Sequence, residues 1–63
     1  MVTLIVELET EGLPMEWEVG AFPSREDAEG AAAIIEKETA QAADAGEDVA
    51  WIGFRTQAVG GAA

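Results

Sequence analysis

Apolar and polar residues alternate along residues 2–9, and this period of two constrains the fold more than any other feature of the chain. One side of the segment carries Val2, Leu4, Val6 and Leu8, and the other carries Thr3, Ile5, Glu7 and Glu9. Successive side chains of a strand point to opposite faces of a sheet, so the alternation predicts a half-buried strand. The sheet is therefore expected to be covered on one side only.

A second alternating segment follows after a short turn, in which Gly12 and Pro14 supply the turn chemistry. Its apolar members are Met15, Trp17 and Val19, and its acidic members are Glu16 and Glu18. So short a connection favours an antiparallel hairpin, because a parallel return needs a crossover of a dozen or more residues. Trp17 belongs to the apolar series, and we expect it in the core.

An alanine-rich segment predicts one helix, from Ser24 to about Asp44. Ser24 is a favourable N-cap, and the acidic residues that follow it complement the positive end of the helix dipole. Gly46 is a suitable stop at the C-terminal end. Small and apolar residues recur every three or four positions and define a core stripe with Ile34 at its margin. The stripe consists of Ala28, Ala31, Ala32, Ile35, Thr39 and Ala42.

Residues 49–57 alternate again and predict a third strand. We assign Ala50, Ile52 and Phe54 to its covered side, and Trp51, Gly53, Arg55 and Gln57 to its open side. A right-handed return through the helix places this strand beside the first. The predicted fold class is α+β: a two-layer ββαβ domain with a three-stranded antiparallel sheet of order 2-1-3 and one helix packed on one face. Residues 58–63 are predicted to be a frayed tail.

Residues 1–63 suffice for a single small domain. A domain of this size buries only roughly 60% of the surface that its unfolded chain exposes. The chain contains no Cys for disulfides, and without His or Cys it lacks the usual ligands of a structural zinc. Its stability must therefore come from packing, within the domain or against a partner or a second copy.

No residue pattern indicates an active site or a cofactor. The absence of His and Cys excludes the common nucleophile–base pairs, and Ser24 is committed to a helix cap. A glycosidase-like carboxylate pair needs a cleft, which so small a two-layer fold scarcely has. The acidic run around Gly46 lacks the ligand spacing of an EF-hand loop and indicates a solvated turn. We therefore expect a protein that is not an enzyme and that holds no cofactor or metal.

The chain also lacks the patterns of export and membrane insertion. Residues 1–8 have no basic n-region or cleavage site of a signal peptide. No segment approaches the roughly 20 apolar residues of a membrane span. Together with the absence of Cys, these features lead us to expect a cytoplasmic protein.

Net charge indicates the kind of partner. Thirteen Asp and Glu against three Lys and Arg give a formal charge of −10, in a chain that is 49% hydrophobic. That composition is too apolar for a disordered acidic tail, so the charge must coat a folded domain. Such a coat repels nucleic acid and anionic lipid, and neither is an expected direct partner. A basic surface on a protein or ribonucleoprotein complex is the expected one.

The open sheet face is the candidate binding surface. Its acidic residues are Glu7, Glu9, Glu16 and Glu18. Residues two apart on a strand lie roughly 6.6–6.8 Å apart and neighbouring strands about 4.8 Å, so we expect a compact grid of carboxylates. A crowd of surface carboxylates that serves only solvation is the alternative interpretation.

Two further residues are assigned to the same face. Trp51 is a candidate interface anchor, and Ile5 beside it would enlarge an apolar spot that could also serve a homodimer. Alternatively, a twist of the strand or the tail buries Trp51 as core. Arg55 either neutralises Glu7 or Glu9 on the adjacent strand or contacts a partner at the rim.

A second acidic surface is expected on the helix and the loop after it. It comprises Glu29, Glu36, Asp44, Glu47 and Asp48. Because helices commonly expose a charged face to solvent, simple solvation is the alternative here.

The segments VTLIVELE, MEWEVGAF, SREDAEGAAAIIEKE and VAWIGFRT, in that order in a small and very acidic chain, resemble the anti-CRISPR proteins of phages, most of all those acting on type I-C systems. The resemblance covers the whole chain and is one of size, charge and element order. It implies a protein encoded by a phage or mobile element that acts in the bacterial cytoplasm and docks on a crRNA-guided surveillance complex or its nuclease. No functional residue can be transferred, because no motif is shared.

Two hypotheses follow. The first is a non-catalytic inhibitor that docks on a basic nucleic-acid-binding surface of a type I CRISPR effector and blocks DNA binding by DNA mimicry. The second is an antitoxin-like or phage regulatory interaction module that uses an apolar patch around Trp51; its hairpin-then-helix order resembles the HicB-type antitoxins. Either could act as a monomer or a weak homodimer.

Overall fold

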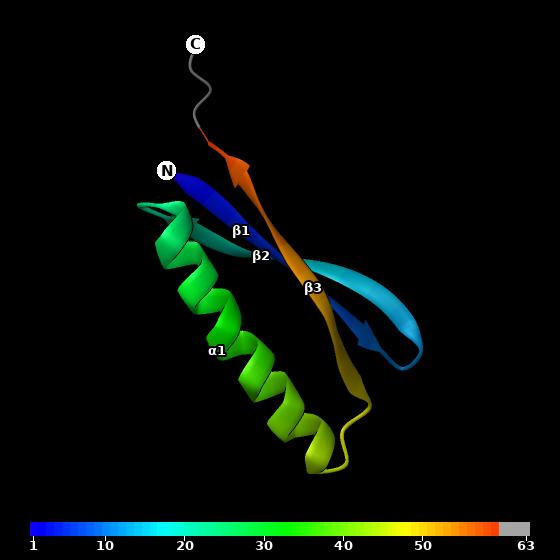
Figure 1. The fold of residues 1–63 in the computed structure, drawn as a ribbon. Coiled ribbons are helices and arrows are strands. Elements are labelled where there is room, and N and C mark those ends of the chain that lie inside the picture. Colours follow the sequence, from blue (N-terminus) through cyan, green and yellow to red (C-terminus); the bar gives the residue numbers. More distant parts are fainter. Residues whose placement is uncertain (60–63) are drawn as a thin grey trace.

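Three strands and one helix follow one another in the order that the sequence predicts. A computed structural model describes residues 1–59 of the chain (Figure 1). The elements are β1 (Val2–Thr10), β2 (Leu13–Phe22), α1 (Arg25–Asp44) and β3 (Val49–Ala58). The sheet has the order β2-β1-β3 with both neighbouring pairs antiparallel. The α+β class and the ββαβ topology are therefore confirmed.

The predicted tail begins too early. Ala58 is the last residue of β3, and the backbone N–H of Val59 donates to the carbonyl oxygen of Met1 at 3.2 Å. The strand ladder thus includes one residue that was assigned to the tail. The rest of that prediction, residues 60–63, lies outside the described residues.

The hairpin turn is tighter than expected. Only Glu11 and Gly12 connect the strands, and both have positive φ angles, 53° and 81°. Two such residues in succession are typical of the type I′ turn, whose twist matches that of the flanking strands. Pro14 consequently lies within β2 and not in the turn. It is tolerated there because β2 is an edge strand, where a missing N–H need not break the ladder.

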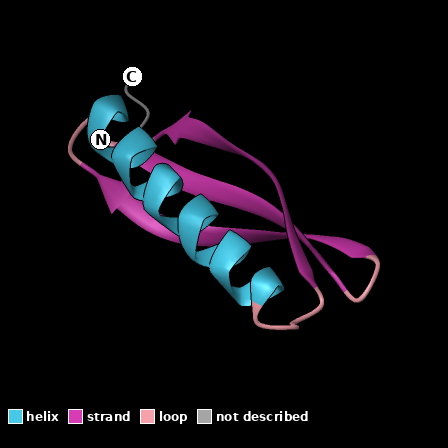
Figure 2. Cartoon of the chain, turned by 60° about the horizontal axis from the view of Figure 1, so that its bottom comes forward, coloured by secondary structure: helices cyan, strands magenta, loops and turns pink. Residues whose placement is uncertain are grey.

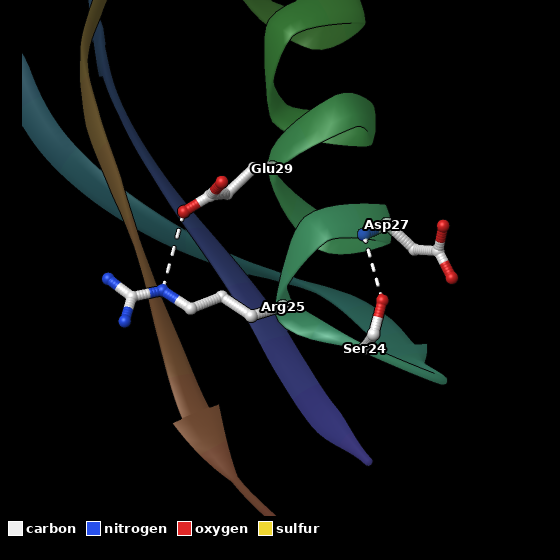
Figure 3. Close-up of polar contacts among 4 residues, drawn as sticks. All are labelled: Ser24, Arg25, Asp27 and Glu29. Atoms are coloured by element: carbon white, nitrogen blue, oxygen red, sulfur yellow. Dashed lines mark hydrogen bonds and ion pairs between the residues drawn. The ribbon is translucent and has the colours of Figure 1, made fainter.

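Helix α1 begins and ends as predicted. The backbone N–H of Asp27 donates to the side-chain oxygen of Ser24 at 3.2 Å (Figure 3). This bond satisfies one of the free N–H groups of the first turn. At the other end Ala45 caps the helix, and Gly46 follows with φ 100°. That left-handed conformation suits Gly because it has no Cβ.

The core lies where α1 crosses the central strand. Leu4 and Val6 of β1 pack against Ala28 and Ala32 of α1, and all four are almost fully buried. Small alanine side chains let the helix approach the sheet closely. Thr39 is buried in the same stripe, and its hydroxyl donates to the carbonyl oxygen of Ile35 at 2.8 Å. Partly buried residues surround this centre: Val2, Phe22, Ala31, Ile35 and Trp51.

A β-bulge interrupts each strand pair and changes which side chains share a face. Between β1 and β3, Glu7 lies opposite Gly53 and Leu8 opposite Trp51, so Ile52 is the extra residue. Because one extra residue reverses the phase of alternation, the residues before the bulge exchange faces. Trp51 therefore lies on the helix side, and the prediction that it occupies the open face was wrong. Ala50, opposite Glu9, moves to the open face in exchange.

Helix α1 leans over β1 and β3 and leaves much of β2 uncovered. Figures 1 and 2 both show the turn between β1 and β2 projecting beyond the helix. Trp17 faces the helix side, opposite Val6, but half of its surface stays exposed. The prediction of Trp17 as a core residue was therefore right about its face and wrong about its burial.

Candidate binding surface

Four carboxylates lie on the open face of the sheet, as predicted. Glu7 pairs directly with Glu16, while Glu18 lies opposite Ile5, and Glu9 lies opposite Pro14. Because directly opposed residues in an antiparallel pair point to the same face, all four glutamates share the face that α1 does not cover. Glu7 is half-buried and the other three are exposed. The face therefore presents two adjacent rows of negative charge.

Arg55 reaches across the sheet to one of these carboxylates. It lies on β3 opposite Ile5 of the central strand, yet its guanidinium donates to and pairs with Glu16 on the far strand β2. The bond and charge of Glu16 raise the pKa of Arg55, and the charge of Glu7 adds to that shift. The expected pairing of Arg55 with Glu7 or Glu9 is thus corrected: the partner is Glu16.

This contact sits where repulsion within the face is strongest. Glu7 and Glu16 are directly opposed like charges, which destabilise a sheet. Placing the Arg55 guanidinium against Glu16, with Glu7 nearby, offsets that repulsion. Among residues 1–59 neither Glu9 nor Glu18 forms an ion pair. These two carboxylates are therefore available to an external cation.

A hollow of about 230 Å³ opens between the charged residues. Ile5 and Ile52 line it together with Glu7, Glu16 and Arg55. Gly53, opposite Glu7, has no side chain to fill the space. Ile52 is 47% exposed and takes the place on this face that was predicted for Trp51.

Ile52 was missed because the third strand was treated as unbroken. Two bulky apolar residues stand in succession at positions 51 and 52, and Gly53 follows them. A glycine inside a strand often marks a bulge, so Gly53 indicated that the alternation could change phase here. That signal was available in the sequence.

The predicted second acidic surface does not form one cluster. Its five residues are all exposed, but Glu29 and Asp44 are fifteen positions apart on α1, about 22 Å at the rise of an α-helix. Glu29 pairs with Arg25 at 3.3 Å, one turn before it (Figure 3). Glu47 and Asp48 lie in the loop after the helix. These acids are spread along the domain, and within residues 1–59 only the sheet face gathers carboxylates from neighbouring strands.

Within residues 1–59, no three acidic side chains are grouped closely enough to hold a metal ion. No helix in the described part of the chain combines the length and the apolar character that a membrane crossing requires. Comparisons with known protein families, with curated proteins and with solved structures find no match for this chain. The chemistry of its surfaces is therefore what indicates its function.

Proposed function

We propose that this chain is a non-catalytic inhibitor that docks its open sheet face on a basic, nucleic-acid-binding surface. The observation that supports this most is the strand register, which sets Glu7, Glu9, Glu16 and Glu18 on one uncovered face. Our specific proposal is an anti-CRISPR protein that occupies the DNA-binding channel of a type I surveillance complex. It acts in the cytoplasm of the host cell and needs no cofactor.

The close spacing of the carboxylate rows supports binding to a cationic, nucleic-acid-binding surface. Carboxylates two apart on a strand are spaced roughly 6.6–6.8 Å, and the neighbouring row lies about 4.8 Å away. Such a surface can engage several Lys and Arg groups at once. Those groups hold nucleic acid in a surveillance complex, and their neutralisation releases counterions. Because a hydrogen-bonded sheet already holds the two rows in place, binding costs little further backbone entropy.

The arrangement around Arg55 adds to this support. Its contact with Glu16 reduces the charge at the centre of the face, while Glu9 and Glu18 remain unpaired among the described residues. The carboxylates of Glu9 and Glu18 thus lie on either side of the hollow. A cationic channel would meet these outer carboxylates first, and the hollow would accept an apolar or aliphatic side chain.

Charge reversal tests the proposed face. The double variant Glu9→Lys with Glu18→Lys should weaken binding to an isolated type I surveillance complex about a hundredfold, because like charges facing across an interface cost several kcal/mol. The matched control reverses Glu36 and Glu47, which changes net charge equally on other surfaces. We expect a change of about threefold or less for that control. Equal losses for both variants would mean that total charge, and not this face, determines binding.

The second candidate is an antitoxin-like interaction module that neutralises a basic ribonuclease or forms a dimer through an apolar spot. Trp51 no longer supplies that spot, since it packs against the core. Ile5 and Ile52 line the hollow together, and they are the apolar residues that would anchor such a module instead of Trp51. Ile52→Ser separates the candidates: it should abolish partner binding for an apolar-anchored module and reduce it only slightly for a polyanionic mimic.

A further inference from the structure

The two outer edges of the sheet differ in their protection against strand addition. Among residues 1–59, β2 and β3 each pair with β1 alone, so each strand leaves one row of backbone groups without a strand partner. Such a row is a template for pairing with another chain, and proteins commonly protect it with Pro, charged side chains or bulges. The register shows which residues form each row.

Alternation along an antiparallel pair identifies the outward backbone groups of β3. The N–H of Val59 donates to the carbonyl oxygen of Met1 at 3.2 Å, so the backbone of Val59 points toward β1. The register is unbroken from Ala58 back to Gly53. Every second residue before Val59 therefore points toward β1, and the residues between them point outward. We call the outward backbone groups of this stretch the β3 edge: those of Phe54, Thr56 and Ala58.

The opposite edge of the sheet is protected. On β2 the outward residues are Pro14, Glu16 and Glu18, because their partners on β1 point their backbone groups toward β3. Pro14 has no backbone N–H, the two glutamates add charge, and a bulge at Val19 interrupts the pairing. Each of these features discourages the addition of a strand.

The β3 edge has none of these features. Residues 53–58 contain no Pro and no acidic residue, and the bulge of β3 lies before them at Ile52. The whole of β3 carries one charge, that of Arg55, in a chain with thirteen acidic residues. Figure 2 shows the C-terminal half of β3 at the margin of the sheet, with no other described element along its outer side. The β3 edge is therefore open to another strand.

A second copy of β3 complements this edge. In an antiparallel pair with its two-fold axis at Thr56, that residue faces Thr56 of the second copy, and Phe54 faces Ala58 of the second copy. Each pair of outward residues exchanges two hydrogen bonds. Opposed threonines are a favourable pair, and a large ring opposite a methyl group avoids a clash. On the open face Arg55 meets Gln57 of the second copy, so no like charges are opposed within β3.

Negative charge opposes this contact only weakly, although each copy carries a formal charge of −10. The carboxylate rows lie on β1 and β2, and the two β1 strands of such a pair are three strand spacings apart. At about 4.8 Å per spacing this is about 14 Å. The Debye length is about 8 Å at physiological ionic strength, so the repulsion between the rows is largely screened. The hydrogen bonds of the β3 edge form where neither copy has an acidic residue.

We propose that the β3 edge binds a second copy of this chain by antiparallel strand addition, with Thr56 at the two-fold axis. The product is a continuous sheet of order 2-1-3-3-1-2. Because opposed residues point to the same face, both helices lie on one side and the two open faces join on the other. The contact uses the edge of the sheet and does not depend on the proposed inhibitor function.

Sedimentation equilibrium of the full chain tests the proposal. The unmodified chain should show a monomer–dimer equilibrium. Its dimer should tighten between roughly 50 mM and roughly 500 mM salt, because screening reduces the repulsion between two acidic copies. A chain that stays monomeric at about 1 mM protein in the higher salt would overturn the proposal. That result would leave the edge to an extended segment of another protein.

Two neighbouring variants test the register. Thr56→Glu and Gln57→Glu each add one negative charge, yet the register predicts opposite results. Thr56→Glu places two carboxylates opposite each other at the axis and should weaken the dimer at least about tenfold. Gln57→Glu faces Arg55 of the second copy and should tighten the dimer about threefold. Equal weakening by both variants would overturn the proposal, since net charge alone would explain it.

A proline variant tests the backbone contact at an exposed position. Thr56 is half-buried, whereas Ala58 is exposed. Ala58→Pro removes an outward N–H, which an edge strand tolerates, and should weaken the dimer at least about tenfold. Its control, Ala58→Ser, keeps the N–H and should change the dimer less than about twofold. Circular dichroism verifies the fold of each variant. A dimer that Ile52→Ser dissociates and Ala58→Pro leaves intact would place the contact on the open face and overturn the proposal.

The dimer and the inhibitor function fail separately. Each Glu→Lys change adds two positive charges, so reversal of Glu9 and Glu18 takes the formal charge from −10 to −6. That variant should lose binding to the surveillance complex and keep the dimer. Ala58→Pro should lose the dimer and still bind the complex, because each chain retains its own open face. Loss of the dimer on reversal of Glu9 and Glu18 would contradict a contact through the β3 edge.

Discussion

The two tryptophans lie on the same side of the sheet but in different surroundings. Trp51 on β3 packs against the core, whereas Trp17 on β2 remains half exposed. Both are neighbours of the central strand, opposite Leu8 and Val6 respectively. The difference follows from the helix, which leans over β1 and β3 and away from β2. Facing the helix side is therefore not enough to bury a residue in a two-layer domain with a single helix.

The stability of alanine variants tests this difference most strongly. Trp51→Ala should lower the free energy of unfolding by about 2 kcal/mol, because it removes a large ring from the edge of a small core. Trp17→Ala should lower it by less than about 1 kcal/mol, since it mainly removes a cross-strand contact with Val6. Urea unfolding followed by circular dichroism measures both. Equal losses would show that α1 covers β2 as well as β3.

A more stable helix sharpens the comparison. Gly30 is exposed in α1, and a methyl group added there would meet no atom within 4 Å. Gly30→Ala should therefore raise the free energy of unfolding by about 1 kcal/mol through helix propensity alone. The thermal midpoint should rise accordingly, with the emission of both tryptophans unchanged. A decrease in stability would reveal a packing role for the space beside Gly30.

The uncovered end of the sheet can be stabilised through its turn. Glu11 has a φ of 53° in a type I′ turn, a conformation that Asn adopts more readily. Glu11→Asn should raise the free energy of unfolding by about 0.5 kcal/mol and keep the N–H bond to the carbonyl oxygen of Asp48. Chemical denaturation detects the change. The matched control is Glu36→Asn, which removes the same charge from a helical position and should be destabilising.

The smallest effect is expected on the open face. Arg55→Gln removes the cation between Glu7 and Glu16 and should reduce stability at low salt, because the two carboxylates then repel each other directly. The reduction should vanish near 1 M salt, where the Debye length is about 3 Å. Thermal melts over a salt series give the comparison. A loss that persists at high salt would mean that Arg55 contributes through packing along its aliphatic stem.

Local patterns were sufficient to predict the elements and their order. Ser24 and Gly46 indicated both ends of α1, and the small-residue stripe from Ala28 to Ala42 identified its buried side. Alternation also placed the four glutamates on one face. These predictions depend on contacts within or between adjacent elements, where the period of the side chains decides the outcome.

The remaining features depend on interruptions and on longer-range geometry. The bulge at Ile52 reversed the faces assigned to Trp51 and Ala50. Alternation places side chains on the correct face only as far as the residue where a bulge changes its phase. The stripe of α1 says which side is buried but not which strands it covers, so the exposure of Trp17 could not be predicted. The contact from Arg55 to Glu16 spans the central strand, and side-chain reach across two strands is not encoded in spacing.

The most direct test of the proposed function is DNA binding by an isolated type I surveillance complex at saturating concentrations of this protein. Open-face mimicry predicts that the unmodified protein lowers the affinity of the complex for target DNA. The Glu9→Lys, Glu18→Lys variant should leave that affinity nearly unchanged, whereas the Glu36, Glu47 control should lower it as the unmodified protein does. An unchanged DNA affinity in the presence of the unmodified protein would contradict the account.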